Sequence, residues 1–442
     1  MKKGNIFSIL AIIVLVAILG CMIKFMMIDD LFNTTSNQSM QEPPGGMNNS
    51  NMNSGNSSLE TKGATEITDT QTVSNVEYKS SSDSENALLI KDNGNLTITN
   101  GTINKTGDAD DENSDFYGTN AGILVTNGGT LKMSDSAVTT NGKHANAVFA
   151  YGTGVANLSN VRINTTSDNS GGIMVTGGGT LNAEKCTVTT EGRSSAAIRS
   201  DRGGGNLTVN GGTYTSNGLG SPAIYSTANI VVSDAELNST QSEGAIVEGK
   251  NSITLKNCVL TDNNTGLNGN STTYKNIFLY QSMSGDADEG TASFTAEGGK
   301  IITKNGDTIY VTNTTAEINL KNVEFTNSSN GDFLRIEAGK WGKSGSNGGT
   351  VTLNAESQKI EGNIVVDDIS TLTLNLNSGS TFIGSVNKDN TAKEIKLVLA
   401  KTSSIKLTGD TYVTSLEDEN QDYSNIDFNG YKLYVNGVAI NK

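Results

Sequence analysis

An internal repeat constrains the fold of this chain more than any other feature. Equivalent apolar positions recur in six consecutive copies, and the differences between their sequence numbers are 25, 25, 25, 26 and 22: Ile123, Val148, Ile173, Ile198, Ile224 and Ile246. A nearly fixed period of this length means that one supersecondary unit is stacked many times, because a single unit cannot bury its own apolar face.

Each copy contains three short runs in which apolar and polar residues alternate, such as 173–176, 180–182 and 187–189. Alternation with period two predicts strands, and the Gly, Asn and Asp residues between the runs tolerate the left-handed backbone of tight corners. Propeller blades have longer repeats, and no leucine-rich consensus is present. We therefore predict an all-β fold, a single-stranded right-handed parallel β-helix of about 13 coils over residues 76–442, with a C-terminal cap. The handedness follows from the crossover rule.

Composition excludes several functional classes. The 442 residues carry 31 basic and 46 acidic side chains, a net charge of −15, which argues against a nucleic-acid partner. One histidine, His144, is too few for histidine-based catalysis or for most zinc sites. Three cysteines cannot form a disulfide scaffold. Cys186 and Cys258 lie three coils apart, beyond disulfide reach, so we expect two buried free thiols.

The N-terminal segment, residues 1–28, predicts export. An almost unbroken apolar run from residue 6 to residue 28 is long enough to span a bilayer, with two lysines before it and two aspartates after it. We expect a signal anchor with a cytoplasmic N-terminus. The alternatives are a lipoprotein signal ending in a lipidated Cys21, or cleavage and release. Residues 29–75, rich in Asn, Ser and Gly, predict a disordered tether. The body would face outward from the cell membrane or sit lipid-anchored at the cell surface.

Four segments of the repeat carry a family resemblance: 146–152 (NAVFAYG), 168–174 (DNSGGIM), 195–203 (SAAIRSDRG) and 280–288 (YQSMSGDAD). They resemble the right-handed parallel β-helix proteins of the pectate-lyase-like (pectin lyase-like) superfamily. Within it they are most similar to bacterial cell-surface proteins described as adhesin-like or carbohydrate-binding. The resemblance spans roughly residues 84–384. It implies an extracellular location and the binding of glycans or pectin-like polymers, but no shared catalytic activity.

Aligning the coils places two columns of side chains on one outer face. The first contains Phe149, Met174, Arg199, Tyr225 and Val247, and the second contains Tyr151, Thr176, Asp201 and Thr227. Three of the five arginines in the chain lie close together, at positions 193, 199 and 202. Aromatic rings cover the C–H faces of sugars, and arginine binds uronate carboxylates in a bidentate manner. We therefore predict a glycan groove formed by Phe149, Tyr151, Met174, Arg199, Asp201, Arg202 and Tyr225. The alternative is an ordinary surface ladder in which Arg199 and Asp201 pair with their neighbours.

Acidic residues in lengthened coils suggest a second kind of site. Asp286, Asp288 and Glu289 cluster in one expected loop, and a similar acidic stretch spans residues 108–115. Carboxylates spaced in this way can bind Ca²⁺, the one cofactor that the sequence leaves open, although solvated loops have the same composition. Catalysis is not expected and no catalytic residue is assigned. The coils next to Asp201 offer no second carboxylate in its column, and Glu248 is expected near the inward register.

Together these features predict a monomeric, membrane-tethered, extracellular β-helix that binds a polysaccharide or a cell-surface glycan, as an adhesin does. Two alternatives remain at this stage. One is a structural surface rod without a specific ligand, and the other is a polysaccharide lyase or hydrolase.

Overall fold

The computed structural model of the chain describes residues 61–268, 271–327 and 331–441. The expected signal anchor, the alternative lipidation site Cys21 and most of the expected tether lie outside these residues. In the described part of the chain, no helix combines the length and the apolar composition that a membrane crossing requires.

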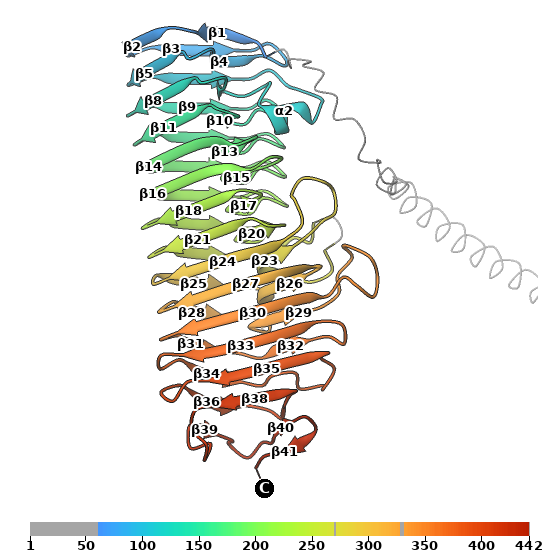
Figure 1. Ribbon diagram of the computed structural model, residues 1–442. Coiled ribbons are helices and arrows are strands. Elements are labelled where there is room, and N and C mark those ends of the chain that lie inside the picture. The colour runs from blue at the N-terminus through green and yellow to red at the C-terminus, as the bar shows by residue number, and fades with distance from the viewer. Residues whose placement is uncertain (1–60, 269–270, 328–330, 442) are drawn as a thin grey trace, which may run out of the picture. The chain divides into compact units, whose positions relative to one another are not determined.

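The described chain winds into a right-handed parallel β-helix of about 15 turns (Figure 1). This confirms the predicted fold and adds about two turns to the expected number. Strands from successive turns pair in parallel, and the one antiparallel pair among the described residues joins the last two strands, β40 and β41. The strands form three faces that run along the axis.

Face 1 is a sheet of twelve parallel strands, each from a different turn. Its strands are β1 (Gly63–Ile67), β4 (Asn86–Ile90), β7 (Ile123–Val125), β10 (Val148–Tyr151), β13 (Ile173–Thr176), β15 (Ile198–Ser200), β17 (Ile224–Ser226), β20 (Ala245–Glu248), β23 (Lys275–Tyr280), β26 (Asp307–Thr312), β29 (Leu334–Ile336) and β32 (Ile364–Val366).

Faces 2 and 3 belong to one 22-stranded sheet, because β14 and β16 bend from one face to the other without interruption. Face 2 consists of β2 (Thr70–Ser74), β5 (Asn95–Thr99), β8 (Thr130–Ser134), β11 (Val155–Ser159), β14 (Gly179–Thr190), β16 (Gly205–Ser216), β18 (Asn229–Ser233), β21 (Ser252–Lys256), β24 (Thr291–Glu297), β27 (Thr314–Lys321), β30 (Gly349–Glu356), β33 (Thr371–Asn377), β35 (Glu394–Leu399) and β38 (Ser415–Asp418).

Face 3 shares β14 and β16 and continues into a separate four-stranded sheet near the C-terminus. Its other strands are β3 (Glu77–Ser80), β6 (Thr102–Lys105), β9 (Ala137–Thr140), β12 (Arg162–Thr165), β19 (Glu236–Ser239), β22 (Val259–Asp262), β25 (Lys300–Thr303), β28 (Glu324–Asn327), β31 (Lys359–Glu361), β34 (Thr381–Gly384), β36 (Ser404–Leu407) and β39 (Ile426–Asp427). The last turns add a small sheet of β37 (Thr411–Val413), β40 (Leu433–Val435) and β41 (Val438–Ala439).

Alternate residues of each strand point into the interior of the β-helix, as the period-two pattern predicts. In β33 the three leucines at positions 372, 374 and 376 are buried and the residues between them are half-buried. Ile173 pairs in register with Ile198 one turn later, so the repeat period brings equivalent side chains together. Cys186 and Cys258 are free and buried among these columns, as expected.

Left-handed corners explain the many asparagines. The residue that follows a face-2 strand has a positive φ in many turns, at Asn75, Asn100, Asp135 and Asn160 among others. Asn and Asp adopt this conformation more readily than other residues with a β-carbon. Their side chains also bond from turn to turn, since Asn100 Nδ2 donates to Asn75 Oδ1 at 3.1 Å and Asn160 Nδ2 to Asp135 Oδ1 at 2.7 Å.

The structure corrects one boundary and one alignment within the repeat. Strands β1 and β2 lie within the expected tether, so the β-helix begins at Gly63 and not at residue 76. These end strands bury little and lack a strong apolar pattern. Within the repeat, Ala245 and not Ile246 pairs with Ile224, because that turn is shorter than its neighbours. At the far end, the antiparallel pair β40–β41 is consistent with the predicted cap.

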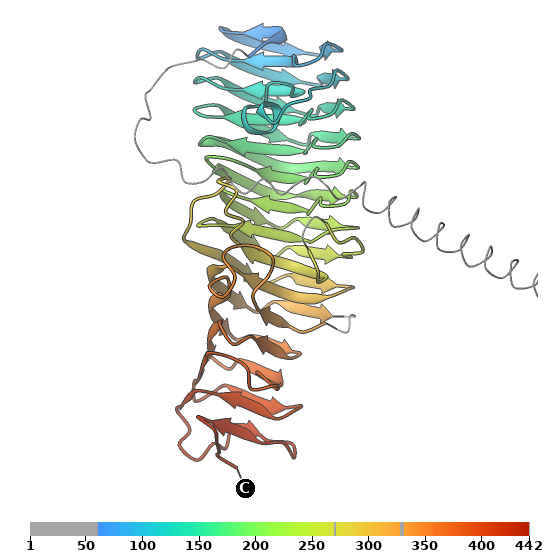
Figure 2. The same ribbon diagram turned by 90° about the vertical axis from the view of Figure 1, so that its right-hand side faces the viewer.

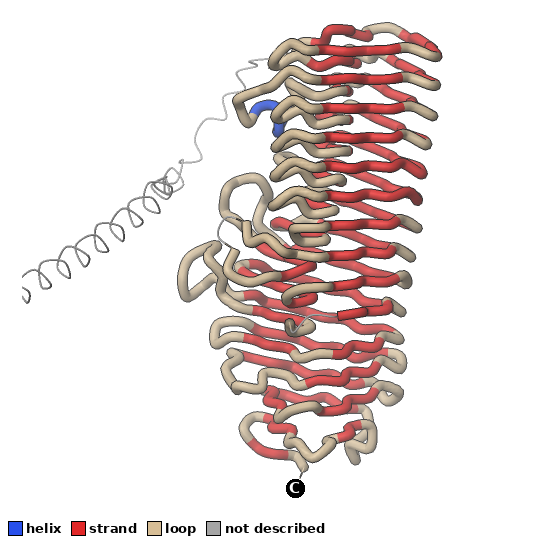
Figure 3. The backbone as a smooth tube through the Cα atoms, turned by 180° about the vertical axis from the view of Figure 1, so that it is seen from behind, coloured by secondary structure: helices blue, strands red, loops and turns tan. Residues whose placement is uncertain are grey.

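Four insertions project beside face 1. They are residues 106–122, which contain the short helix α2 (Asn113–Tyr117), residues 263–268 with 271–274, residues 281–290 and residues 337–348. Figures 1 and 2 show that the loops project from one side of the stack, and Figure 3 shows the same loops in tan beside the red strands. Face 1 therefore has a wall of inserted segments, whereas faces 2 and 3 are joined mostly by tight corners.

Candidate functional site

One outward column of face 1 organises the candidate site. Strand register aligns Phe149 with Met174, Met174 with Arg199, and Arg199 with Tyr225, in the predicted order. The next member is Ile246 and not Val247, because of the short turn between β17 and β20. The column then continues through Phe278, Tyr310 and Arg335.

The first half of this column is covered by the insertion 106–122. Phe149 and Met174 have no exposed surface, and they belong to a small apolar cluster with Leu89, Ala121 and Leu124. Gly118 of the insertion has φ +71°, and a β-carbon there would lie 2.9 Å from Phe149 Cγ. Phe149 and Met174 are therefore packing residues, which corrects their assignment to the groove.

Tyr151 is also removed from the predicted groove. Its ring packs edge-on against Tyr117 of α2, with 5.5 Å between the ring centroids. The insertion is held down close by, because Thr176 Oγ1 donates a hydrogen bond to the Phe116 carbonyl at 2.6 Å. Tyr151 and Thr176 of the second predicted column thus support the insertion and do not form an open surface.

A cavity of about 350 Å³ lies where the covering insertion ends. Three predicted residues, Arg199, Asp201 and Tyr225, line it. The remaining lining comes from neighbouring turns and from all four insertions. Its acidic members are Glu112, Asp115, Asp201, Glu243 and Asp286, and its aromatic members are Phe116, Tyr225, Phe278, Tyr280 and Trp341.

Arg199 is held between two carboxylates at the floor of the cavity. Its Nη2 donates to Asp201 Oδ2 at 3.0 Å, and its Nη1 lies 3.6 Å from Asp115 Oδ1. Asp115 Oδ2 in turn lies 2.7 Å from His144 Nδ1, and this hydrogen bond raises the pKa of His144. The pairing that the ladder alternative expected is present, so the Arg199 guanidinium is already occupied by acidic neighbours.

Asp201 is a buried carboxyl in the cavity lining with a raised pKa. Its side chain is 8% exposed. Burial is the main cause that raises the pKa of Asp201 to about 6; Arg199 opposes this shift, and the nearby Asp286 contributes to it. The carboxyl therefore titrates under mildly acidic conditions.

Glu248 occupies a different place from the one expected. Ala245 and Val247 join the interior core, so the alternating Glu248 projects outward. Although fully buried, its carboxylate accepts hydrogen bonds from the hydroxyls of Tyr225, Tyr280 and Ser282. The Tyr280 bond is 2.8 Å long. Glu248 thus ties two lining tyrosines to the start of the insertion 281–290, and burial raises the pKa of both tyrosines.

Lys275 and Glu243 form a buried pair beside the cavity. Lys275 Nζ lies 3.4 Å from Glu243 Oε1, and the side chains are 4% and 8% exposed. The ammonium also lies 4.5 Å from the centroid of the Phe278 ring. Burial lowers the pKa of Lys275, and the attraction of Glu243 opposes that shift.

The three predicted Ca²⁺ ligands do not converge. Asp286 Oδ1 accepts a hydrogen bond from Arg202 Nε at 2.7 Å, while Asp288 Oδ2 lies 2.9 Å from Lys250 Nζ, and Glu289 is exposed. Within residues 61–268, 271–327 and 331–441, no group of three or more His, Cys, Asp and Glu residues is arranged to hold a metal ion. The metal-site hypothesis is therefore wrong for this trio, because each aspartate is drawn to a different cation.

Arg202 lies just outside the cavity lining. Its guanidinium carbon stands 3.8 Å from the centroid of the Phe116 ring while its Nε binds Asp286. Arg202 therefore connects the insertion 106–122 to the insertion 281–290. Arg202 therefore belongs to the predicted region, but it holds the walls of the cavity together and does not line the cavity itself.

Sequence reasoning missed the aromatic part of the site. Phe278 and Tyr280 stack with their centroids 4.3 Å apart, and Trp341 lies 5.5 Å from Tyr280. One signal was available. The spacing between paired face-1 positions lengthens from Ala245 to Ile277 and again from Leu334 to Ile364. The single tryptophan of the chain lies in the second of these lengthened turns.

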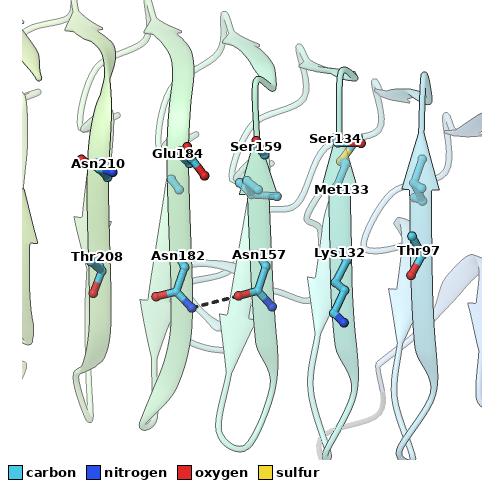
Figure 4. A pocket seen from close by; sticks show the side chains of 13 residues that line it. Thr97, Lys132, Met133, Ser134, Asn157, Ser159, Asn182, Glu184, Thr208 and Asn210 are labelled. Atoms are coloured by element: carbon cyan, nitrogen blue, oxygen red, sulfur yellow. Dashed lines mark hydrogen bonds between the residues drawn. The ribbon is translucent and has the colours of Figure 1, made fainter.

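A second depression, of about 410 Å³, lies on face 2. Figure 4 shows its side chains as a regular ladder across neighbouring strands, with Asn182 bonded to Asn157. Its lining is mainly Asn, Thr and Ser, with one lysine and one glutamate and without an aromatic ring. Because this surface repeats the same exposed residue types from turn to turn, we place the candidate site in the face-1 cavity.

Comparison with known proteins supports the fold. Residues 146–290 match the family described as "Right handed beta helix region". No curated protein and no solved structure matches the chain significantly. The matched segment includes Arg199, Asp201 and Tyr225 on the floor of the cavity, but it ends before Trp341 and begins after Phe116. The fold is consistent with the pectate-lyase-like β-helix proteins that the sequence resembles.

Proposed function

We propose that the face-1 cavity binds part of a glycan and that the chain presents this cavity outside the cell. The observation that carries the proposal is the lining itself. Five aromatic rings and five carboxylates, contributed by several turns and by four insertions, meet in one cavity of about 350 Å³. This volume is within the range of roughly 300–1,000 Å³ that small-ligand sites occupy.

The two kinds of side chain suit the two kinds of sugar surface. Aromatic rings pack against apolar C–H faces, and carboxylates accept hydrogen bonds from hydroxyl groups. The neighbouring ion pairs and the Glu248 hydrogen bonds hold the lining residues in place before a ligand arrives. Such preorganisation reduces the ordering cost of binding.

The adhesin-like role follows from the same proposal. A repeat column gives a long, rigid support because each turn is fixed by its neighbours. With the expected N-terminal membrane attachment, the column would hold the cavity away from the cell surface, where polymeric glycans are accessible. Binding to a glycan would then attach the cell to a surface or retain a polysaccharide near it.

Trp341 offers the clearest test. Arg199 and Tyr225 are unsuitable probes, since both are tied to buried carboxylates and their loss would disturb the floor. Trp341→Ala removes a half-buried ring from an insertion and should lower glycan affinity about tenfold, the usual size of a central aromatic contact. The purified chain would be screened on a glycan array, and its best ligand measured by calorimetry.

The matched control is Tyr434→Ala. Tyr434 stacks on Tyr412 with 4.5 Å between centroids, in the last turns of the β-helix and away from the cavity. It should leave affinity unchanged. An array without any bound glycan, or equal affinities for the native chain and Trp341→Ala, would contradict the proposed site and favour a structural rod.

Hydrolysis of the bound glycan is a second candidate, favoured by Asp201. A carboxyl with a pKa of about 6 suits a general acid, and the insertions bring other carboxylates into the same cavity, which sequence alignment did not foresee. Release of new reducing ends from the array ligand, abolished by Asp201→Asn, would support this activity. If the ligand is unchanged after long incubation, glycan binding without hydrolysis remains as the proposed function.

A further inference from the structure

We propose that the glycan recognised by the face-1 cavity carries protonated amino groups, as an amino sugar without its acetyl group does. This inference rests on the proposed glycan-binding function and names the class of ligand. It reverses the expectation of an acidic polysaccharide, which came from the cluster of arginines in the sequence.

The charge of the lining favours a cation. Five carboxylates and one guanidinium line the cavity. Two further cations, Arg202 and Lys275, pair with the lining residues Asp286 and Glu243. Counting them leaves three positive groups against five negative ones, or four against five when His144, which pairs with the lining residue Asp115, is protonated. An incoming uronate would add a sixth carboxylate to this group, whereas an ammonium group would reduce the imbalance.

The positive groups are also already engaged. Arg199 lies between Asp201 and Asp115, Arg202 binds Asp286, and Lys275 lies against Glu243. A bidentate uronate contact needs a free guanidinium edge aimed at the ligand. To bind a uronate, Arg199 would first have to release a carboxylate from a buried ion pair, which is costly because that charge would be left unpaired.

One buried acceptor in the lining lacks a hydrogen bond. Asp115 is 6% exposed, and its Oδ1 accepts none, since its cationic neighbour Arg199 Nη1 lies 3.6 Å away. An ammonium group carries three donors and no acceptor. A ligand amine reaching this floor would satisfy the unused acceptor. A hydroxyl or acetamide group could also donate a hydrogen bond there, but it would bring no positive charge.

The aromatic rings support the same class of ligand. Cations bind to the faces of aromatic rings, because the ring face carries partial negative charge. The surroundings of the cavity already use this contact, with Arg202 over Phe116 and with Lys275 over both Phe278 and Tyr310. Rings and carboxylates together therefore favour a sugar whose apolar face and ammonium group are both recognised.

The experiment compares three hexasaccharides that differ in charge: a glucosamine oligomer, its fully N-acetylated form and hexagalacturonate. Binding to the purified full chain is measured by calorimetry in mildly acidic buffer, in which the amines of the glucosamine oligomer are protonated, at low and high salt. We expect the amine form to bind about tenfold more tightly than the acetylated form, and this ratio to shrink in high salt.

Matched variants test the source of the preference. Glu112→Gln combined with Asp286→Asn removes two lining charges with little change in shape, and it should reduce the amine preference severalfold. Asp288→Asn is the control, because Asp288 also forms an ion pair in the same insertion but does not line the cavity. An unchanged circular dichroism spectrum and an unchanged urea midpoint would show that the double variant is folded.

The outcomes separate the two proposals. Equal binding of amine and acetylated forms, or tighter binding of hexagalacturonate, would overturn the amine inference and leave glycan binding standing. An amine preference that is unaffected by the double variant would also overturn it, because the preference would arise elsewhere. If no oligosaccharide binds and the array also shows no ligand, the proposed function itself fails.

Discussion

Asp286 Oδ1 accepts a hydrogen bond from Arg202 Nε at 2.7 Å, although 84 positions separate the two residues in the sequence. The same guanidinium stands 3.8 Å from the centroid of the Phe116 ring, which belongs to a third segment. Arg202 thus joins two insertions to the turn that follows β15. The cavity depends on such contacts between inserted segments, whereas the β-helix beneath it depends on the repeat.

Replacing Arg202 should loosen the walls of the cavity more than it destabilises the fold. Its side chain is 46% exposed, so the ion pair with Asp286 stabilises the protein by about 1 kcal/mol or less. We expect Arg202→Ala to change the urea midpoint little and to accelerate amide hydrogen exchange in residues 282–289. Lys250→Ala, which removes the other ion pair of that insertion, is the comparison. Unchanged exchange in Arg202→Ala would contradict the wall role.

The buried carboxylate of Glu248 should make the hydroxyl of Tyr280 important for stability. Tyr280→Phe removes one of three hydroxyl donors from a fully buried acceptor. Hydrogen bonds to charged groups contribute about 1.5–3 kcal/mol, so the free energy of unfolding should fall by about that amount. Urea denaturation would measure it. Tyr434→Phe, at a stacked ring pair in the last turns, should change stability by less than about 0.5 kcal/mol. Equal losses of unfolding free energy in the two variants would mean that the hydrogen bond from Tyr280 to Glu248 does not stabilise the fold.

The arrangement of the repeat could be predicted from the sequence, whereas the arrangement of the insertions could not. The pairing of Ile173 with Ile198 and the order Phe149, Met174, Arg199, Tyr225 could be predicted, because the residue spacing fixes which side chains are stacked. The error of register in this column, Ile246 against the expected Val247, arose in a short turn.

The repeat spacing does not predict that the insertion 106–122 covers part of the face-1 column. The contact between Thr176 and the Phe116 carbonyl joins residues 60 positions apart, and it depends on how an insertion folds back over face 1. Burial of Phe149 and Met174 follows from that fold-back. Trp341 and Asp286 reach the cavity in the same way, from loops whose lengths are visible in the sequence but whose paths are not.

The two thiols in the interior provide a test of the packed core. Cys186 is fully buried and Cys258 is 3% exposed, and burial raises the pKa of both thiols. Alkylation requires an accessible thiolate, so neither cysteine should react with iodoacetamide in the native protein. Both should react in guanidinium chloride. Peptide mass spectrometry resolves each site, and rapid native labelling of either one would show that the interior opens.

Asp201 should make stability depend on pH with a defined sign. Burial raises its pKa from 3.8 to about 6, so the folded protein holds this proton more tightly than the unfolded chain. The stabilisation is full below about pH 3.8 and is lost as the pH rises through about 6, by up to roughly 3 kcal/mol. Asp201→Asn should lack this dependence. Urea unfolding of both proteins across this range measures the difference, with the exposed Asp288→Asn as control. A constant difference between native protein and Asp201→Asn would contradict the raised pKa.

Trp341 should report directly on occupancy of the cavity. It is the single tryptophan of the chain, so all tryptophan emission comes from a half-buried ring in the cavity lining. A glycan packed against this ring displaces water from it, and the emission should shift to shorter wavelength. The shift should saturate at the ligand concentrations that calorimetry gives for binding.

Two controls make this measurement specific. Free N-acetyltryptophanamide should show no shift with the same glycan, and Tyr434→Phe should retain the shift, because Tyr434 stacks on Tyr412 in the last turns and does not line the cavity. If calorimetry detects binding while the emission stays constant at saturation, the ligand occupies another surface. The face-2 depression, which contains no aromatic ring, would then become the site to examine.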